Sequence, residues 1–156
     1  MKHILIILSL FLLSFTIISC KSTDNTTSTD NTTSTDNTTT SPWTKQLGTS
    51  SDDQGLGVTT DSSGNIYVTG YTGGGLDGNT SSGNHDIVLV KYNSTGTKQW
   101  TKQLGTSGGD QGLGVTTDSS GNIYVTGLTD GRLDGNTISG GSDIFLVKYN
   151  STGTKQ

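Results

Sequence analysis

The chain has 156 residues, about the length of a single domain. Its 13 acidic residues outnumber its 9 basic ones and give a formal net charge of −4 at pH 7. The lysines are isolated and do not alternate with aromatic residues, which excludes the basic patch typical of nucleic-acid-binding proteins. We therefore expect no nucleic-acid partner.

Residues 1–19 have the pattern of a signal peptide. A short basic start precedes the apolar run ILIILSLFLLSFTII, whose 15 residues are too few for a membrane-spanning helix but suit a secretory signal. The run ends in Ser19 and Cys20, and Cys20 is the only cysteine of the chain. The pattern predicts export.

A small residue followed by cysteine after such a run resembles the lipobox of bacterial lipoproteins. The resemblance implies that residues 1–19 are removed and that Cys20 is acylated, for example with palmitate, which anchors the protein to a membrane. Lys21 is not the aspartate that retains many lipoproteins at the inner membrane, so we expect the outer membrane or the cell surface. The alternative is an ordinary signal peptide with an incidental cysteine.

Residues 20–42 continue into a low-complexity tether. The hexapeptide STDNTT occurs three times before Pro42, and the stretch after Cys20 contains no apolar residue. Such a segment cannot bury enough surface to offset the entropy of ordering it. We expect a flexible linker; a surface that carries carbohydrate or binds a ligand is the other interpretation.

The body consists of two copies of one unit, residues 43–99 and 100–156. Each copy has 57 residues, and the two differ at nine positions when aligned without gaps. A period of this length indicates a repeat architecture. The chain contains no alanine and no glutamate, but it is rich in glycine and threonine, which argues against helices and favours an all-β fold.

Each unit reads as four short strands separated by turns. In the first copy they are expected at 53–61, 65–72, 86–93 and 98–105, and the last of them crosses the repeat boundary. Asp61, Gly64 and Asn65 are expected to form one tight turn, with positive φ at Gly64 and Asn65, and Gly96 is expected in a second turn. We predict two four-stranded antiparallel β-propeller blades; a β-sandwich or a β-solenoid is the alternative.

The body also resembles a known family of bacterial β-propeller repeats, the SBBP (seven-bladed β-propeller) repeats. The resemblance covers essentially all of residues 43–156. It rests on DSSGNIYVTG, on DIFLVKYN, on the tryptophan that opens each copy, and on three glycines and one aspartate: Gly140, Gly141, Gly153 and Asp143. It implies a scaffold and carries no catalytic signature.

The body is poor in groups that suit catalysis. Its one histidine, His85, is replaced by Ser142 in the second copy, and it contains no glutamate and no Gly-x-Ser-x-Gly motif. We expect no catalytic residue and no enzyme. A catalytic propeller, the less favoured alternative, would depend on Asp53 and Asp110 converging at the centre of one end.

Calcium is the one cofactor that the sequence suggests. Asp and Asn oxygens are the hard ligands that Ca²⁺ prefers, and each copy places three such residues in one connection. Turn chemistry explains the same Asp-Gly-Asn pattern and is the favoured interpretation. The two candidate sets are Asp77, Asn79 and Asp86, and Asp134, Asn136 and Asp143.

The nine differences between the copies all fall near one end of the predicted sheets. Loops at one end of a rigid scaffold commonly carry recognition, whereas neutral drift after duplication is an equally good explanation. Under the first interpretation the protein binds a protein or glycan ligand through Asp52, Tyr71, His85, Asp130 and Arg132. The differences are Ser51/Gly108, Asp52/Gly109, Tyr71/Leu128, Gly73/Asp130, Gly75/Arg132, Ser81/Ile138, Asn84/Gly141, His85/Ser142 and Val88/Phe145.

Two blades do not close a ring, since propellers use about four to eight. The first copy opens with a fourth-strand sequence at Trp43, and the second lacks the corresponding sequence after Gln156. We expect a homo-oligomer, three or four chains arranged head to tail, in which Trp43 of one chain completes the blade of another. The alternative is a truncated or recently duplicated fragment without independent activity.

Overall fold

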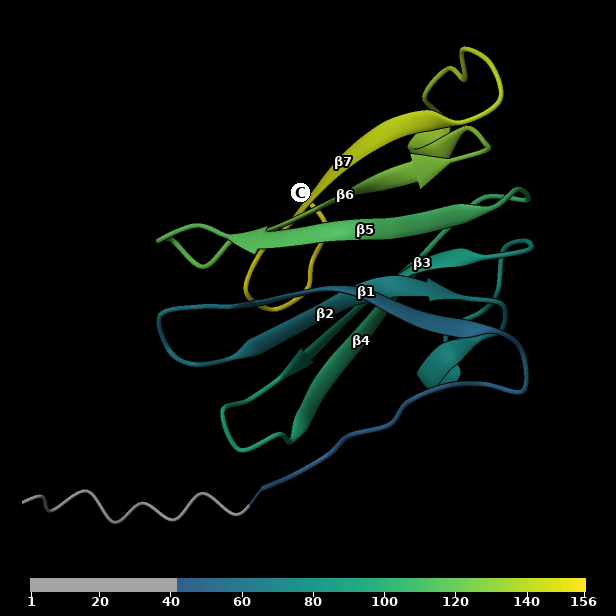
Figure 1. The fold of residues 1–156 in the computed structure, drawn as a ribbon. Helices are drawn as coiled ribbons and strands as arrows, with labels where there is room; N and C mark the ends of the chain where they lie inside the picture. Colours follow the sequence, from purple (N-terminus) through teal and green to yellow (C-terminus); the bar gives the residue numbers. More distant parts are fainter. Residues whose placement is uncertain (1–41) are drawn as a thin grey trace, which may run out of the picture. The chain divides into compact units, whose positions relative to one another are not determined.

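The structure, a computed structural model, describes residues 42–156 (Figure 1). This part of the chain is all β, as predicted, and contains seven strands and two single 3₁₀ turns. None of its helical turns is long and apolar enough to cross a membrane. The predicted signal peptide, Cys20 and nearly all of the tether lie outside the described residues.

The first blade is a four-stranded antiparallel sheet with the order β1-β2-β3-β4. Every strand agrees with its predicted range to within one residue at each end. The fourth strand crosses the repeat boundary, which confirms that prediction. The strands are β1 (Asp53–Thr60), β2 (Ile66–Thr72), β3 (Asp86–Tyr92) and β4 (Lys98–Leu104).

The second blade is a three-stranded sheet with the order β5-β6-β7. The two predicted antiparallel blades are confirmed, and the second has three strands within residues 42–156, as expected for a copy that lacks the fourth-strand sequence. Only an isolated bridge between Tyr149 and Lys155 marks the start of a fourth strand. Residues 43–47, which have the sequence of a fourth strand, lie extended and pair with no strand. The strands are β5 (Asp110–Thr117), β6 (Ile123–Thr129) and β7 (Asp143–Tyr149).

The long connection after the second strand of each blade contains a 3₁₀ turn that the sequence reading did not anticipate. The turns are η1 (Leu76–Gly78) and η2 (Leu133–Gly135). The leucine of each turn is buried, with 4% and 6% exposure for Leu76 and Leu133. The connection is thus fixed to its sheet by one apolar side chain.

The tight turn between β1 and β2 forms largely as predicted. Gly64 has φ +77°, but Asn65 does not have positive φ, so that part of the prediction is wrong. Asn65 instead donates through its backbone N–H and its side-chain amide to the Asp61 carboxylate, at 2.9 and 2.8 Å. These two bonds tie Asn65, the residue before β2, to the carboxylate that opens the turn.

Each sheet has two different faces because successive side chains of a strand point to opposite sides. The leucine face carries Ile87 and Leu89 in the first sheet, and Ile144 and Leu146 in the second. The valine face carries Ile66, Val68, Val88 and Val90 in the first sheet, and Ile123, Val125, Phe145 and Val147 in the second.

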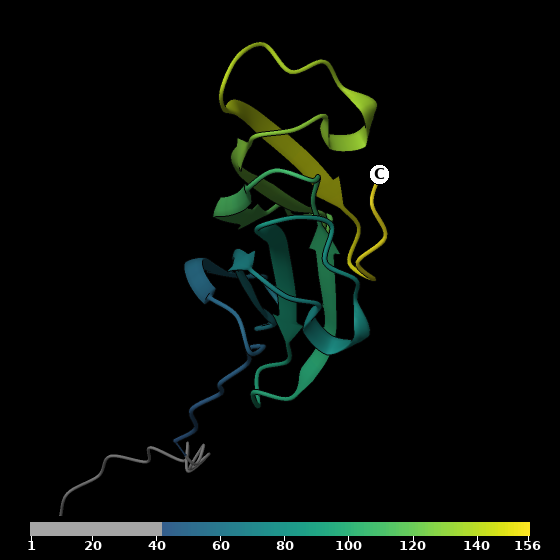
Figure 2. The same ribbon diagram turned by 90° about the vertical axis from the view of Figure 1, so that its right-hand side faces the viewer.

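The core lies between the two sheets, which pack face to face (Figures 1 and 2). The leucine face of the first sheet contacts the valine face of the second, and Tyr67, Ile123 and Val125 between them are fully buried. The first strands of the two blades lie side by side, and the Thr117 hydroxyl donates to the Thr60 carbonyl at 3.2 Å. The architecture is that of two neighbouring blades of an open propeller.

Candidate functional site

The connections in which the two repeats differ meet at one end of the molecule. Asp53 pairs with Thr72, and Thr72 with Asp86, so β1 starts, β2 ends and β3 starts at the same level. The second sheet repeats this register. We call the connections 48–52, 73–85, 105–109 and 130–142 the loop end. The prediction that they leave the sheets at one end is confirmed.

Four aspartates close the connections of the loop end. Each stands at the start of a strand and accepts a hydrogen bond from the backbone N–H four residues earlier, at 2.5 to 2.8 Å. This arrangement fixes the last residues of every connection relative to the strand that follows. The pairs are Thr49–Asp53, Ser82–Asp86, Thr106–Asp110 and Ser139–Asp143.

Asp53 and Asp110, the pair that a catalytic propeller would use, are engaged in this way. Thr72 donates its hydroxyl to Asp53 at 2.5 Å, and Thr129 does the same to Asp110. Burial acts to raise the pKa of Asp53, but the hydrogen bonds from Thr49 and Thr72 outweigh it and leave the pKa lowered. Both carboxylates therefore organise their own loops.

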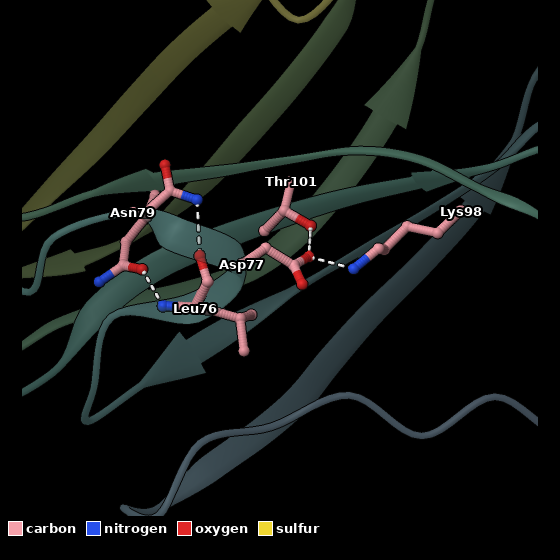
Figure 3. A network of polar contacts seen from close by, with 6 residues as sticks. Leu76, Asp77, Asn79, Lys98 and Thr101 are labelled. Atoms are coloured by element: carbon pink, nitrogen blue, oxygen red, sulfur yellow. Dashed lines mark hydrogen bonds and ion pairs between the residues drawn. The ribbon is translucent and has the colours of Figure 1, made fainter.

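The first candidate calcium set is divided among separate contacts (Figure 3). Asp77 pairs with the Lys98 ammonium at 2.5 Å and accepts a hydrogen bond from Thr101. The hydrogen bond from Lys98 lowers the pKa of Asp77. The Asn79 amide donates to the Leu76 carbonyl at 2.7 Å, which closes the 3₁₀ turn.

Asp86 completes that set and lies apart from Asp77, at the start of β3. It is fully buried, and Gln103 of β4 donates to its Oδ2 at 2.7 Å. Its Oδ1 has no hydrogen-bond partner. Within residues 42–156, no three side chains of the His, Cys, Asp or Glu types gather closely enough to hold a metal ion.

The second candidate set follows the same pattern. Asp134 pairs with Lys155, the Asn136 amide donates to the Leu133 carbonyl at 2.8 Å, and Asp143 closes its connection through Ser139. The side chains that were grouped by sequence spacing therefore serve turns, ion pairs and loop closure in both copies.

Three of the five predicted ligand contacts lie close together. The rings of Tyr71 and His85 are 4.5 Å apart between centroids, tilted by 52°, and both side chains are half-buried. The His85 carbonyl accepts from the Asp110 N–H at 2.8 Å, and the Gly109 carbonyl accepts from the Asp130 N–H at 3.0 Å. His85 and Asp130 therefore flank Gly109 on its two sides.

The other two predicted contacts are both exposed. Asp52 accepts a hydrogen bond through its carbonyl from the Gly73 N–H at 2.7 Å, next to the end of β2. Arg132 lies directly before η2, away from the Tyr71–His85 pair along the chain. The structure gives no contact that joins Arg132 to the other four residues.

Two of the nine differences between the repeats compensate each other in size, which the sequence patterns did not reveal. A Cβ on Gly108 would lie 3.0 Å from the Asp130 Cβ, and a Cβ on Gly73 would lie 3.0 Å from the Ser51 Cβ. Each blade therefore has one glycine in this contacting pair. The glycine is the second member in the first blade (Gly73) and the first member in the second blade (Gly108). The reciprocal exchange of glycine in the aligned repeats was the signal that could have revealed this contact.

The two blades are also joined at the loop end. The Asn84 N–H donates to the Gly108 carbonyl at 3.1 Å, and His85 and Gly109 form a parallel bridge. The larger residues Asn84 and His85 of one blade thus face Gly108 and Gly109 of the next. Part of the variation at this end therefore reflects packing, and the half-buried Tyr71–His85 pair lies next to this contact between the blades.

Two antiparallel sheets with their first strands side by side, built from a repeated sequence, define a protein made of propeller-type blades. Residues 43–77 and 99–134 match the model of the family described as Beta-propeller repeat (SBBP). Both matches begin at or next to the repeat tryptophan and end at the 3₁₀ turn. The two matches support a protein built from propeller repeats.

A curated protein supports the same class. The chain is 28% identical over 115 residues to the uncharacterized WD repeat-containing protein L264 of Acanthamoeba polyphaga mimivirus. The match covers 59% of this chain and 8% of the length of that protein.

Proposed function

We propose that this protein is an exported, lipid-anchored interaction module whose loop end binds a protein or glycan ligand. The observation that carries the proposal is the half-buried Tyr71–His85 pair, held at the loop end of a rigid two-blade scaffold. Binding residues commonly lie on loops that a rigid scaffold positions, and tyrosine is enriched at the centres of recognition surfaces. The flanking carboxylates of Asp52 and Asp130 add hydrogen-bond acceptors.

Binding fits this end of the molecule better than catalysis. The carboxylates at the strand starts already accept hydrogen bonds from their own loops, so they serve loop geometry. The ring of His85 lies tilted against the ring of Tyr71. A rigid, hydrogen-bonded surface of this kind suits recognition, because little conformational entropy is lost on binding.

The anchor belongs to the same proposal. Acylation of Cys20 would place the propeller repeats on a membrane, and the tether of residues 21–42 would separate them from its surface. The loop end could then reach ligands outside the cell.

The test compares the full chain with the double variant Tyr71→Leu/His85→Ser, which introduces the residues found at these positions in the second repeat. The probes are a glycan array and a phage-displayed peptide library. We expect at least one specific binder of the native chain, whose affinity falls by about tenfold or more in the variant, since interface anchors commonly contribute that much.

The matched control is Ser94→Ala, in an exposed turn at the opposite end of the first sheet. It should leave binding unchanged. Binders whose affinity is unchanged by the double variant would contradict the proposed site, and a chain that selects no binder from either probe would contradict the proposed function.

A further inference from the structure

We propose that copies of this chain associate head to tail, with residues 43–47 of one copy completing the three-stranded sheet of another. The inference does not depend on the ligand-binding function proposed above. It rests on unequal burial of equivalent residues, on the position of Trp43, and on an open strand position beside β7.

Equivalent side chains of the two leucine faces differ sharply in exposure. Ile87 and Leu89 of the first sheet are 2% and 1% exposed, whereas Ile144 and Leu146 of the second are 83% and 72% exposed. In the first sheet, a valine face covers these residues. The second sheet therefore presents an exposed apolar surface. The packing within the chain shows that a valine face fits such a surface.

The complementary face is only partly covered, since Ile66 and Val68 are half-buried, although Val88 and Val90 are 7% and 4% exposed. The valine face of the first sheet borders an open groove of about 330 Å³ that is lined by Trp43, Leu47, Val68 and Val88, among others. The equivalent face of the second sheet packs against a leucine face, and its Ile123 and Val125 are fully buried. The exposed leucine face of the second sheet and the partly covered valine face of the first are opposite in kind and lie on opposite sides of the two-blade unit, so a second copy can bring them together.

Trp43 already occupies the position that this association requires. A Cβ on Gly96 would lie 2.7 Å from the Trp43 ring, just as a Cβ on Gly153 would lie 3.1 Å from the Trp100 ring. Trp100 belongs to β4, the fourth strand of the first blade, and packs on the second blade. Residues 43–47 thus lie on the first blade as a fourth strand of a preceding blade would.

The edge of β7 offers the place for that strand. A groove of about 320 Å³ follows this edge and is lined by Leu133, Asp143, Phe145 and Val147, among others. Lys155 and Gln156 pair only with the far end of β7, through the Tyr149–Lys155 bridge and a 2.9 Å bond from the Gln156 N–H to the Lys148 carbonyl.

A glutamine of the fourth strand makes three hydrogen bonds in the first blade that have no counterpart in the second within residues 42–156. In the first blade, Gln103 of β4 donates to Asp86 at 2.7 Å and to the Gly74 carbonyl at 3.0 Å, and accepts from the Leu76 N–H at 3.0 Å. The residue equivalent to Gln103 in the preceding fourth-strand sequence is Gln46, which is exposed. In a head-to-tail pair, Gln46 of one copy would make the same three bonds to the second blade of another, with Asp143 in place of Asp86.

The loop ends agree with this arrangement. Within the chain, Asn84 and His85 face Gly108 and Gly109 across the blade interface. Between copies, Gly141 and Ser142 would face Ser51 and Asp52 of the next chain. Larger residues therefore oppose smaller ones at both interfaces, with the sides exchanged, which is what packing without overlap requires.

The register follows from the first blade, where Ile87 pairs with Leu104. The equivalent pair between copies is Ile144 and Leu47. The test uses full-length chains that carry Cys20→Ser, so that introduced cysteines are the only thiols. One chain receives Leu47→Cys and the other Ile144→Cys, and we expect a disulfide-linked heterodimer only when the two are mixed, because the interface joins different surfaces.

Two controls fix the interpretation. Ile87→Cys with Leu104→Cys in one chain should form an intramolecular disulfide, which shows that this register permits the bond. Leu104→Cys mixed with Ile144→Cys should give no heterodimer, because Leu104 is held in its own blade. A working intramolecular control without a Leu47–Ile144 heterodimer would overturn the proposal.

A second measurement tests the surface without cysteines. Light scattering of the full chain in detergent should give three or four times the protomer mass, since rings of about six or eight blades close. Ile144→Asp with Leu146→Asp should reduce the mass to that of a protomer without unfolding it, whereas Ser119→Asp, an exposed turn variant of equal charge change per site, should not. A native chain that is monomeric at micromolar concentrations would contradict the association.

Discussion

At the scale of single residues, one glycine in the second strand of each blade allows the first two strands to approach closely. The register between β1 and β2 shifts between Gly55 and Gly57, which brings the Gln54 carbonyl over Gly70. A Cβ on Gly70 would lie 1.7 Å from that oxygen, and a Cβ on Gly127 would lie 1.8 Å from the Gln111 carbonyl in the second blade. Because the obstacle is backbone, no rotamer change relieves it.

Gly70→Ala should therefore lower the free energy of unfolding by about 1–3 kcal/mol, the usual range for overpacking. Urea unfolding followed by tryptophan fluorescence measures the change. Gly141→Ala is the matched control, since a Cβ there meets nothing within 4 Å, and it should leave the midpoint nearly unchanged. Equal effects of the two substitutions would show that the bulge does not impose the glycine.

Compensation between neighbouring residues belongs to the same scale. Ser51 lies against Gly73 in one blade, and Asp130 against Gly108 in the other. Some of the variable positions that suggested ligand recognition therefore vary because of packing: where one residue of a contacting pair has a side chain, the other is glycine.

At the scale of elements, the turn between the first two strands of each blade is organised by one carboxylate. Asp118 accepts hydrogen bonds from the Asn122 amide at 2.8 Å, the Asn122 and Ser120 N–H groups at 2.9 Å, and the Tyr124 hydroxyl at 3.0 Å. These bonds, with the Asn122 amide first, hold the pKa of Asp118 at about 2, below the ordinary 3.8. Asp61 makes the equivalent bonds in the first blade.

This shift predicts a pH-dependent contribution to stability. The folded-state pKa of Asp118 is lowered, so its contribution is fully present above about pH 4 and is lost as the pH falls through about 2. Asp118→Asn should therefore be less stable than the native chain at pH 5, and the difference should shrink by pH 2. Urea midpoints of both proteins at the two pH values measure it, and a difference independent of pH would contradict the role of the ionised carboxylate.

At the scale of the whole molecule, the two blades are held together by a leucine face packed on a valine face, and each blade offers the opposite face outward. The leucine face of the second sheet, with Ile144 and Leu146 exposed, therefore remains available for association. The tether and the proposed anchor add a second constraint, because they would gather copies at one membrane and raise their local concentration.

The proposed acylation of Cys20 can be tested on the whole molecule. Expressed in a bacterium with a lipoprotein pathway, the full chain should incorporate an alkyne-tagged palmitate and fractionate with membranes. Cys20→Ser should lose the label and move to the soluble exported fraction, whereas Ser19→Ala, which keeps a small residue before the cysteine, should retain both. Label in the Cys20→Ser protein would place acylation elsewhere.

The sequence by itself determined the blade. The strand ranges, the strand that crosses the repeat boundary, the positive φ of Gly64 and Gly96, and the gathering of the variable connections at one end all follow from local patterns: alternation, turn residues and a fixed repeat length. Such signals depend only on residues that are close together in the chain. The two nearly identical copies contain the same signals.

The tertiary structure decided what those residues do. Sequence spacing grouped Asp77, Asn79 and Asp86 as one candidate set, but their contacts are separate. A lysine and a threonine hydroxyl bind Asp77, a backbone carbonyl accepts from the Asn79 amide, and a backbone N–H donates to Asp86. The sequence likewise could not show that Ile87 is buried while Ile144, the equivalent residue of the second repeat, is exposed. The two side chains are identical and differ only in what packs on them. Burial and pairing are properties of the surfaces that meet, and those surfaces exist only once both sheets have formed.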